Sequence, residues 1–420
     1  MLDSPPMWDA LWHNGPIATM TTGSRFGLIE AGAIAAQDGR IAWVGPAAAL
    51  PVAPAAAART VYDLEGRLLT PGLVDPHNHA VYYGDALADF ELLTQGGTRA
   101  DMIASGGGVG GLVRQTRGAT DEQIYAASAA RVAKLIAAGM TTLESKSGAG
   151  LDLDTELRCL RIGRRLGRDL PVRIVTTFLG AHGIAPEYRG RADRYIDYLC
   201  ETVLPAAVKE GLVDQVDGFC DTTGFTHEQI TRLFETAQVH RLPVKLHAEQ
   251  YRDYRAADLV ARFKGLSADH LEFAGEPTIQ AMAAAGTVAT LLPGAHWTMG
   301  ETQRPPVALL RKHGVPMALA TNCNPVSSHT TSPTMMMNMA CRLFGLTTEE
   351  ALAGFTRNGA RALGVLDSRG TLELGKLADL AIWDADKPGA LAYPIADNPC
   401  REVVQGGRPI YRAAPIRFIA

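Results

Sequence analysis

A chain of 420 residues, 47% of them hydrophobic and 20% charged, is too apolar for a disordered protein. It is long enough for one large core with an appendage, or for two or three ordinary domains. The formal net charge of -4 provides no basic surface for nucleic acid, and no apolar run reaches the roughly 18 residues that span a bilayer. The segment MLDSPPMWDALWHNG lacks the basic and apolar regions of a secretory signal, so we expect a cytoplasmic protein.

Strand-like and helix-like segments alternate along most of the chain. Most of the short β-branched or apolar runs are followed by an amphipathic segment rich in Ala, Leu and Arg. The runs are Leu68–Asp75, Met140–Ser145, Val172–Phe178, Val213–Cys220, Pro243–His247, Leu266–His270, Thr287–Leu292 and Val315–Thr321. Eight such units predict an α/β fold of the (β/α)8 barrel type, because a doubly wound sheet fits this number of units less well.

The two ends of the chain have a different pattern from the middle. Residues 15–66 and 371–412 carry alternating, glycine-punctuated segments that are typical of β-strands. We therefore expect the barrel to occupy residues 69–365 and a small flanking β-sandwich domain to be built from residues 1–68 and 366–420. The glycine-rich segment 105–120 lacks the phosphate-binding pattern of nucleotide loops, and we expect it to be a mobile active-site loop.

Histidines occur where the predicted strands end. His77 and His79 lie two residues apart in LVDPHNHA, so both imidazoles point to one face of the strand. His247 ends another strand, and Glu249 follows it by two residues, which predicts that the two share a face. In a barrel these strand ends meet at the catalytic rim, so two histidines and then a third can converge there.

Further polar residues fall at the same predicted rim. His270 follows the strand LSADH, Asn322 follows ALAT, and His182 follows the strand that contains TFLGAH. Three imidazoles with one oxygen ligand form a shell suited to zinc or another borderline divalent ion. Such an ion lowers the pKa of a bound water molecule, and a nearby carboxylate or imidazole can accept its proton as it attacks a carbonyl.

Extended motifs make the sequence similar to the amidohydrolase superfamily and, within it, to the imidazolonepropionases of histidine degradation. The resemblance covers most of the chain and is carried by TPGLVDPHNHA, FELLTQGGT, TTLESKSGAGLDLDTELR, VTTFLGAHGIAPEYRGRADRYID, VKLHAEQ, LSADHLE, LLPGAHW and TTSPTMMMNMAC. It implies a metal-dependent barrel hydrolase that adds water to the lactam carbonyl of 4-imidazolone-5-propionate, opening the ring to N-formimino-glutamate. It also implies one divalent ion, zinc first and iron as the alternative, and a homodimer.

The same resemblance assigns roles to individual residues. The metal ligands that it implies are His77, His79 and His247, with Asn322 at the place of the fourth ligand. The residues implied in proton transfer and substrate contact are Glu249, His270, His182, Gln250, Asn324 and Asn322 itself. The substrate that it implies is a small heterocycle that carries a carboxylate.

Asn322 is the most serious departure from the family pattern. Family members have Asp in a TDCNP motif, whereas this chain has TNCNP. An amide oxygen carries no negative charge and cannot act as a base. Either the metal is held by three histidines and a neutral oxygen, with Glu249 or His270 taking the proton, or Asn322 is a replacement that stalls turnover.

A second group of departures surrounds the expected substrate. The arginine that grips the propionate in the family aligns with Ala86, and two family tyrosines align with Arg99 and Ala149. A pocket altered at this many contacts predicts a different ring, such as an N-methylated, 2-thioxo or hydantoin form. Arg99 or Arg252 can then bind the carboxylate, since a guanidinium forms two hydrogen bonds with it.

Two other functions stay open at this stage. The same water could attack an amidine carbon and release ammonia, which would make the protein an aminohydrolase. Loss of the acidic ligand at Asn322 could instead have left a silent protein that binds a ligand without turnover.

Overall fold

The computed structural model describes residues 7–414. Eight parallel strands form one sheet in the order β13-β12-β11-β10-β9-β8-β7-β6. They are β6 (Leu73–Asp75), β7 (Met140–Lys146), β8 (Arg173–Ala181), β9 (Gln215–Cys220), β10 (Lys245–Ala248), β11 (Ser267–His270), β12 (Val288–Leu291) and β13 (Met317–Leu319). The backbone N–H of Asn322, after β13, donates to the carbonyl oxygen of His77, after β6, at 3.0 Å. The sheet is therefore a nearly closed barrel, as predicted.

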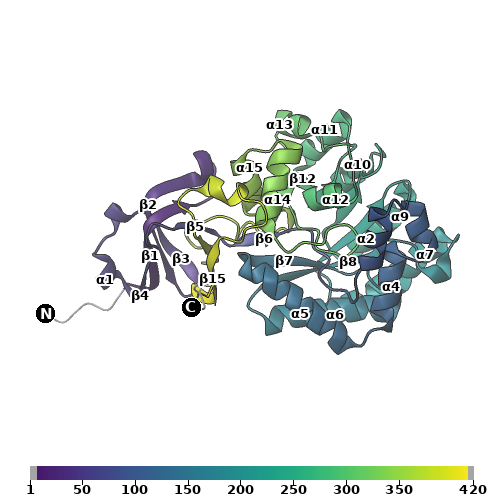
Figure 1. The fold of residues 1–420 in the computed structure, drawn as a ribbon, viewed down its shortest axis with the longest axis horizontal. Helices are drawn as coiled ribbons and strands as arrows, with labels where there is room; N and C mark the ends of the chain where they lie inside the picture. Colours follow the sequence, from purple (N-terminus) through teal and green to yellow (C-terminus); the bar gives the residue numbers. More distant parts are fainter. Residues whose placement is uncertain (1–6, 415–420) are drawn as a thin grey trace. The chain divides into compact units, whose positions relative to one another are not determined.

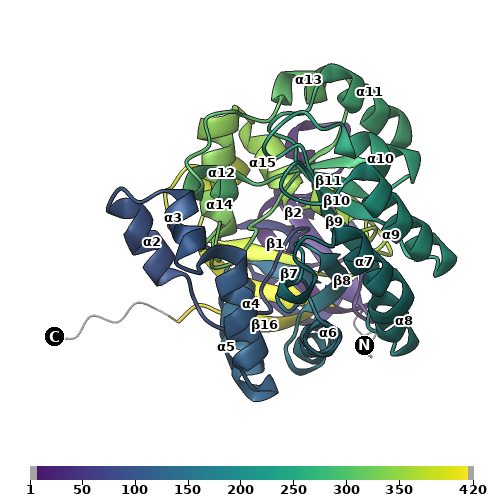
Figure 2. The same ribbon diagram turned by 90° about the vertical axis from the view of Figure 1, so that its right-hand side faces the viewer.

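Helices surround these strands because each has one apolar face. Leu157, Leu160 and Leu166 of α6 (Leu153–Asp169) are buried, while its arginines face outward. The helices α9 (His227–Val239), α10 (Ala256–Arg262) and α11 (Glu276–Ala285) repeat the arrangement around the strands (Figure 2). The remaining helices are α1 (Pro54–Ala57), α5 (Asp121–Ala137), α7 (Ala192–Tyr198), α8 (Leu204–Lys209), α12 (Pro293–Thr298), α13 (Val307–Lys312), α14 (Pro333–Met339), α15 (Thr348–Gly354) and α16 (Arg357–Ala362).

The first predicted strand is two strands in the structure. Leu68–Pro71 forms β5 of a second sheet, whereas β6 belongs to the barrel. Gly72 lies at the change of direction, and a Cβ at this position would come within 2.3 Å of the Thr141 side chain. Close backbone approach therefore requires glycine here. A continuous apolar pattern in the sequence conceals such a change between sheets.

The second sheet is built from both ends of the chain. It has the order β16-β15-β14-β5-β1-β2-β3, with β4 paired to β1, and its strands from the two ends lie side by side (Figure 1). Its strands besides β5 are β1 (Trp8–Ala18), β2 (Leu28–Gln37), β3 (Arg40–Pro46), β4 (Ala58–Asp63), β14 (Leu380–Trp383), β15 (Cys400–Gln405) and β16 (Arg408–Arg412). Trp12, Ile34 and Val404 lie in its buried core. The expectation of a β-domain formed from both ends is confirmed.

The glycine-rich segment is not the loop that we expected. Residues Gly108–Gly118 form helix α4, preceded by α2 (Leu87–Thr94) and α3 (Arg99–Ala104). Leu112, Val113 and Thr116 supply a buried face, and this face outweighs the low helix propensity of the four glycines in the helix.

The chain divides into two compact units. One contains the segment before Pro76, residues 133–142 and the segment after Thr331, and the other contains residues 76–132 and 143–331. The boundaries expected at 68/69 and 365/366 stay a prediction. Among the described residues, no helix is long and apolar enough to cross a membrane.

Candidate metal centre and its pocket

Three imidazoles converge at the ends of two barrel strands. His77 and His79 follow β6, and His247 lies in β10. Nε2 of His77 lies 3.1 Å from Nε2 of His79, and the potential ligand atoms of the three histidines all lie within 4.8 Å of one another. The spacing of two residues predicted that His77 and His79 converge, and they do so in the segment after β6, where strand alternation no longer applies.

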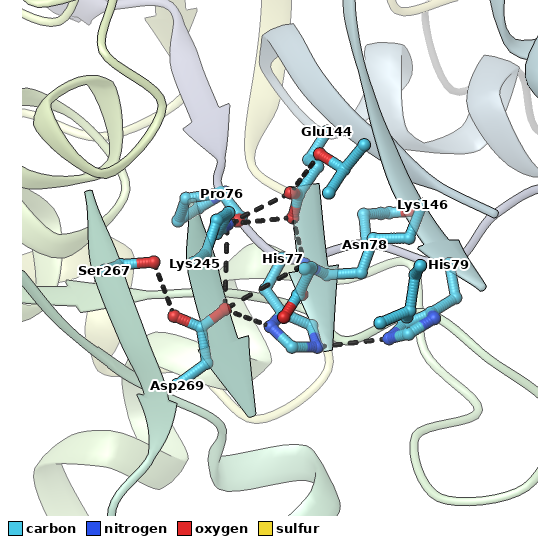
Figure 3. Close-up of polar contacts among 12 residues, drawn as sticks. Pro76, His77, Asn78, His79, Glu144, Lys146, Lys245, Ser267 and Asp269 are labelled. Atoms are coloured by element: carbon cyan, nitrogen blue, oxygen red, sulfur yellow. Dashed lines mark hydrogen bonds and ion pairs between the residues drawn. The ribbon is translucent and has the colours of Figure 1, made fainter. Parts of the chain in front are cut away.

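Two aspartates orient the histidines. Oδ2 of Asp269 lies 2.6 Å from Nδ1 of His77, and Oδ2 of Asp217 lies 3.2 Å from Nδ1 of His247. Figure 3 shows His77 between Asp269 and His79. A carboxylate beside Nδ1 accepts a hydrogen bond from the Nδ1–H group. The ring proton then stays on Nδ1, and Nε2 keeps its lone pair. Both rings therefore have an unprotonated Nε2 that can bind a metal ion.

The donor set fits a divalent metal ion. Nitrogen ligands at about 2.0–2.1 Å from an ion lie roughly 3 Å apart, which is the separation between His77 and His79. Burial lowers the pKa of His77 and of His79 well below the usual value, so both rings are neutral at pH 7. The neutral imidazole is the form that binds metal.

A buried ionic network adjoins these histidines. Nζ of Lys146 lies 2.5 Å from Asp217 and 2.9 Å from Glu144. Nζ of Lys245 lies 3.1 Å from Glu144 and 3.6 Å from Asp269 (Figure 3). All five side chains are fully buried. Burial disfavours the ammonium form of Lys146, but attraction by Asp217 and Glu144 outweighs this and raises its pKa.

Our sequence reading overlooked this network, although a signal was present. Glu144 and Lys146 occupy alternate positions in the β-branched strand pattern TTLESK, and Lys245 lies between apolar residues in VKLH. A buried strand tolerates such residues only when their charges are paired, so the pattern predicts a paired cluster inside the barrel.

A cavity of about 130 Å³ opens beside the three histidines. Its polar lining includes His79, Arg99, Ser147, His182, His247, Gln250, Tyr251, His270, Asn322, Asn324 and Ser327, and Ala149 also lines it. Seven of the residues expected to bind substrate or to act in catalysis are thus brought together here: His182, Arg99, Ala149, Gln250, His270, Asn322 and Asn324.

Glu249 lies outside that lining, which corrects the expectation that it shares a face with His247. Its carboxylate accepts hydrogen bonds from the backbone N–H groups of Ala256 and Ala257 at the start of α10. Strand β10 ends at Ala248, and Glu249 has φ +50°, so strand alternation no longer applies to it. Gln250, the next residue, lines the pocket instead.

Ala86 and Arg252 are also absent from the lining of this pocket. Ala86 precedes α2 and lines a separate outer cavity of about 740 Å³. Arg252 is exposed and its guanidinium lies 5.8 Å from the ring centre of Tyr254. The roles expected of these two residues in substrate contact therefore have no support in the pocket geometry.

Asn322 is fixed by neutral hydrogen bonds. Its backbone has φ +49°, a conformation that asparagine tolerates better than most residues. Its Oδ1 accepts from Nδ2 of Asn324 at 3.1 Å, and its Nδ2 donates to Oγ of Ser327 at 3.3 Å. Asn322 thus lines the pocket, with its side-chain amide held by two neighbouring polar side chains.

Two further histidines in the lining have distinct surroundings. Nδ1 of His182 lies 3.3 Å from the carbonyl oxygen of Gly148, and burial lowers the pKa of His182 to about 4. Nδ1 of His270 is buried without a hydrogen-bond partner among the described residues, with Oε2 of Glu272 3.9 Å away. The ring of His270 lies beside the convergent histidines, with its centre 5.9 Å from that of His77 and 5.5 Å from that of His247.

The chain matches known proteins over most of its length. Residues 104–411 match the amidohydrolase family. The chain is 50% identical over 400 residues to the imidazolonepropionase of Caulobacter vibrioides, covering 95% of this chain and 99% of that protein. It is 51% identical over 403 residues to the imidazolonepropionase of Ralstonia nicotianae, covering 96% and 98%.

Solved structures share the fold at low sequence identity. An adenosine deaminase from Xanthomonas campestris with bound zinc has a TM-score of 0.67 and 19% identity, covering 97% of this chain and 93% of the other. Atrazine chlorohydrolase from Arthrobacter aurescens TC1, complexed with zinc, has a TM-score of 0.68 and 16% identity, covering 96% and 95%. These likenesses concern the fold, whereas identity near 50% over nearly the full length decides the family. The chain belongs to the imidazolonepropionase family of the amidohydrolases.

Proposed function

We propose that this chain hydrolyses a five-membered cyclic amide that carries a propionate tail, either 4-imidazolone-5-propionate or a ring-modified analogue. Water supplies an oxygen atom to the carbonyl carbon, the ring C–N bond breaks, and the released nitrogen takes a proton. The product is an N-substituted glutamate. The observation that carries the proposal is the set of three convergent, carboxylate-oriented histidines beside a pocket, in a chain about half identical to imidazolonepropionases.

We propose that His77, His79 and His247 hold one divalent ion, with Asn322 beside it. Nitrogen-rich ligand sets favour zinc, and iron is the alternative. When bound, the ion lowers the pKa of water toward neutrality and polarises a carbonyl group. Asp217 and Asp269 keep two of the imidazoles in the orientation and tautomer that this requires.

Proton transfer falls to His270 in this proposal. Glu249 is engaged with the first amides of α10, and Asn322 is not a base. His270 lines the pocket, and its ring centre lies 5.5 Å from that of His247 and 5.9 Å from that of His77. We propose that this residue accepts the proton of the attacking water and passes it to the departing ring nitrogen.

His182 and Gln250 also line the pocket and can donate or accept hydrogen bonds with the ring. Ala149 supports a modified ring, because its small side chain leaves space where the family has a tyrosine. An N-methyl or 2-thioxo substituent would occupy that space.

The test is a spectrophotometric screen of imidazolone, N-methylimidazolone, hydantoin and 2-thiohydantoin propionates with protein loaded with zinc or iron. We expect metal-dependent loss of the ring absorbance without release of ammonia. Ammonia release would instead identify an aminohydrolase. Tight substrate binding without turnover by fully loaded protein would identify a silent binding protein. Equal turnover of all four rings would contradict the modified-ring part of the proposal.

We also propose a homodimer in the cytoplasm. Leu87, Phe90 and Leu93 of α2 and Ile103 of α3 are more than 40% exposed, and apolar side chains grouped in this way are typical of contact surfaces. Light scattering behind a sizing column should give twice the mass of the chain. A monomeric mass at micromolar concentration would contradict the dimer.

A further inference from the structure

The pocket beside the three histidines is built for an anion. Its described lining contains no carboxylate, and Arg99 is the one side chain in it with a permanent positive charge. Arg99 also lines the outer cavity of about 740 Å³, so it lies where the two cavities adjoin. The Arg99 side chain can therefore contact the part of a substrate that projects away from the three histidines.

Tyr251 holds the guanidinium of Arg99 in place. One terminal nitrogen of Arg99 donates to the Tyr251 hydroxyl oxygen at 3.1 Å, and the guanidinium carbon lies 5.0 Å from the centre of the ring. The backbone N–H of Tyr251 donates to Asp221 at 2.9 Å, and its ring packs edge-on against Phe219 at 6.2 Å. Tyr251 is therefore fixed from two sides.

The pair leaves hydrogen-bond donors unused. None of the described carboxylates forms an ion pair with Arg99, so its remaining N–H groups are available. Burial raises the pKa of Tyr251, so its hydroxyl stays protonated at pH 7. The hydroxyl oxygen accepts from Arg99 and can still donate its own proton. Two adjacent donors, one of them charged, match the two oxygens of a carboxylate.

We propose that Arg99 and Tyr251 bind the carboxylate of the substrate and so determine which cyclic amides the enzyme accepts. This inference rests on the proposed function. This site replaces the contacts that Ala86 and Ala149 cannot make. Arg252 was the other arginine expected in this role, but it is exposed and lies outside the lining. The substrate class is thus a cyclic amide whose acidic tail points toward α3.

The test compares tails as well as variants. Arg99→Gln and Tyr251→Phe are assayed with ring substrates that carry either a propionate or a propionamide tail, and Arg252→Gln is the matched control. For the propionate, Arg99→Gln should raise KM about 10- to 100-fold, with a smaller effect on kcat, because a hydrogen bond between charged groups is lost. For the propionamide, KM should hardly change. Tyr251→Phe should show a smaller effect of the same kind, and Arg252→Gln none. An equal effect of Arg99→Gln on both tails, or no effect on either, would overturn the proposal.

Binding without turnover separates this proposal from the proposed function. Hydantoin-5-propionate and its propionamide are titrated into wild type and Arg99→Gln in a calorimeter. Selective loss of affinity for the propionate supports the carboxylate site even if no ring is opened, in which case only the proposed function fails. Unchanged affinity for the propionate in Arg99→Gln, alongside ring opening by wild type, rejects the carboxylate site alone.

Discussion

Oδ2 of Asp269 lies 2.6 Å from Nδ1 of His77, and both side chains are fully buried. The same oxygen lies 3.6 Å from Nζ of Lys245. Asp269 thus connects His77 to the buried ionic network. Its position two residues after Ser267, whose hydroxyl donates to the other carboxylate oxygen at 2.6 Å, fixes the carboxylate further.

Asp269→Asn should weaken metal binding by about 10- to 100-fold, because an amide no longer holds the tautomer and basicity of His77. Competition with a chromophoric chelator measures the dissociation constant. Asp253→Asn, at an exposed aspartate, is the control and should leave metal affinity unchanged. Equal metal affinity in Asp269→Asn and wild type would show that the hydrogen bond to His77 does not tune the site.

Lys146→Met should lower the free energy of unfolding by about 3–5 kcal/mol, because it leaves buried carboxylates without their cation. Lys209→Met, at the exposed end of α8, should stay within about 0.5 kcal/mol of wild type. Denaturant unfolding measures both. Adding Asp217→Asn to Lys146→Met should recover part of the loss, and an additive further loss would argue against direct coupling.

Asn322→Asp should bind the divalent ion more tightly and turn over substrate faster, because a carboxylate adds negative charge and a possible proton acceptor beside the histidines. The rate is compared at equal metal content, measured by elemental analysis. A rate equal to or below that of wild type under these conditions would mean that asparagine is adapted to the chemistry of this chain.

Glu272 makes the stability depend on pH. Burial raises its pKa to about 8, against about 4.3 in an unfolded chain. Between these values the folded protein holds a proton that the unfolded chain has released, so the free energy of unfolding falls as pH rises through this interval. Glu272→Gln should remove that dependence. The free energy of unfolding of Glu272→Gln should increase relative to that of wild type from pH 5 to pH 8. The total change should be no more than about 5 kcal/mol. Denaturant midpoints at pH 5, 6.5 and 8 measure it, and parallel pH profiles would contradict it.

Ala149→Tyr should reduce the space available beside the substrate ring. We expect kcat/KM to fall by about 5- to 150-fold for the ring-modified substrate that wild type prefers, since overfilling a packed site costs about 1–3 kcal/mol. Unsubstituted imidazolone propionate should suffer less. Ala88→Tyr, at an exposed position of α2 outside the lining of the cavity beside the histidines, serves as the matched control. Equal losses on both rings would place the modified group elsewhere.

The sequence was sufficient for the barrel and for the convergence of three histidines at one end of it. His247 at a strand end followed from the barrel itself, whereas His77 and His79 converge in the segment after β6, which ends at Asp75. Alternation failed at Glu249 because the strand ends one residue earlier and the backbone turns to positive φ. The alternating pattern of a strand does not predict the residue at which the strand ends.

Other features depend on distant packing. Gly72 separates two sheets because its backbone lies against Thr141, and no local pattern reports that contact. Helix α4 forms in a glycine-rich segment because Leu112 and Val113 are buried. The choice of Arg99 over Arg252 rests on which guanidinium lines the pocket, and their residue type alone could not decide it.

Thr70 of β5 pairs with Ala381 of β14, and β5 is otherwise flanked only by β1. During synthesis on the ribosome, β1 to β5 emerge long before their C-terminal partner. Until residue 380 leaves the exit tunnel, β5 exposes unpaired backbone groups that can recruit another nascent chain. Completion of this sheet therefore waits for β14, and chaperones that shield strand edges should raise the yield of native enzyme.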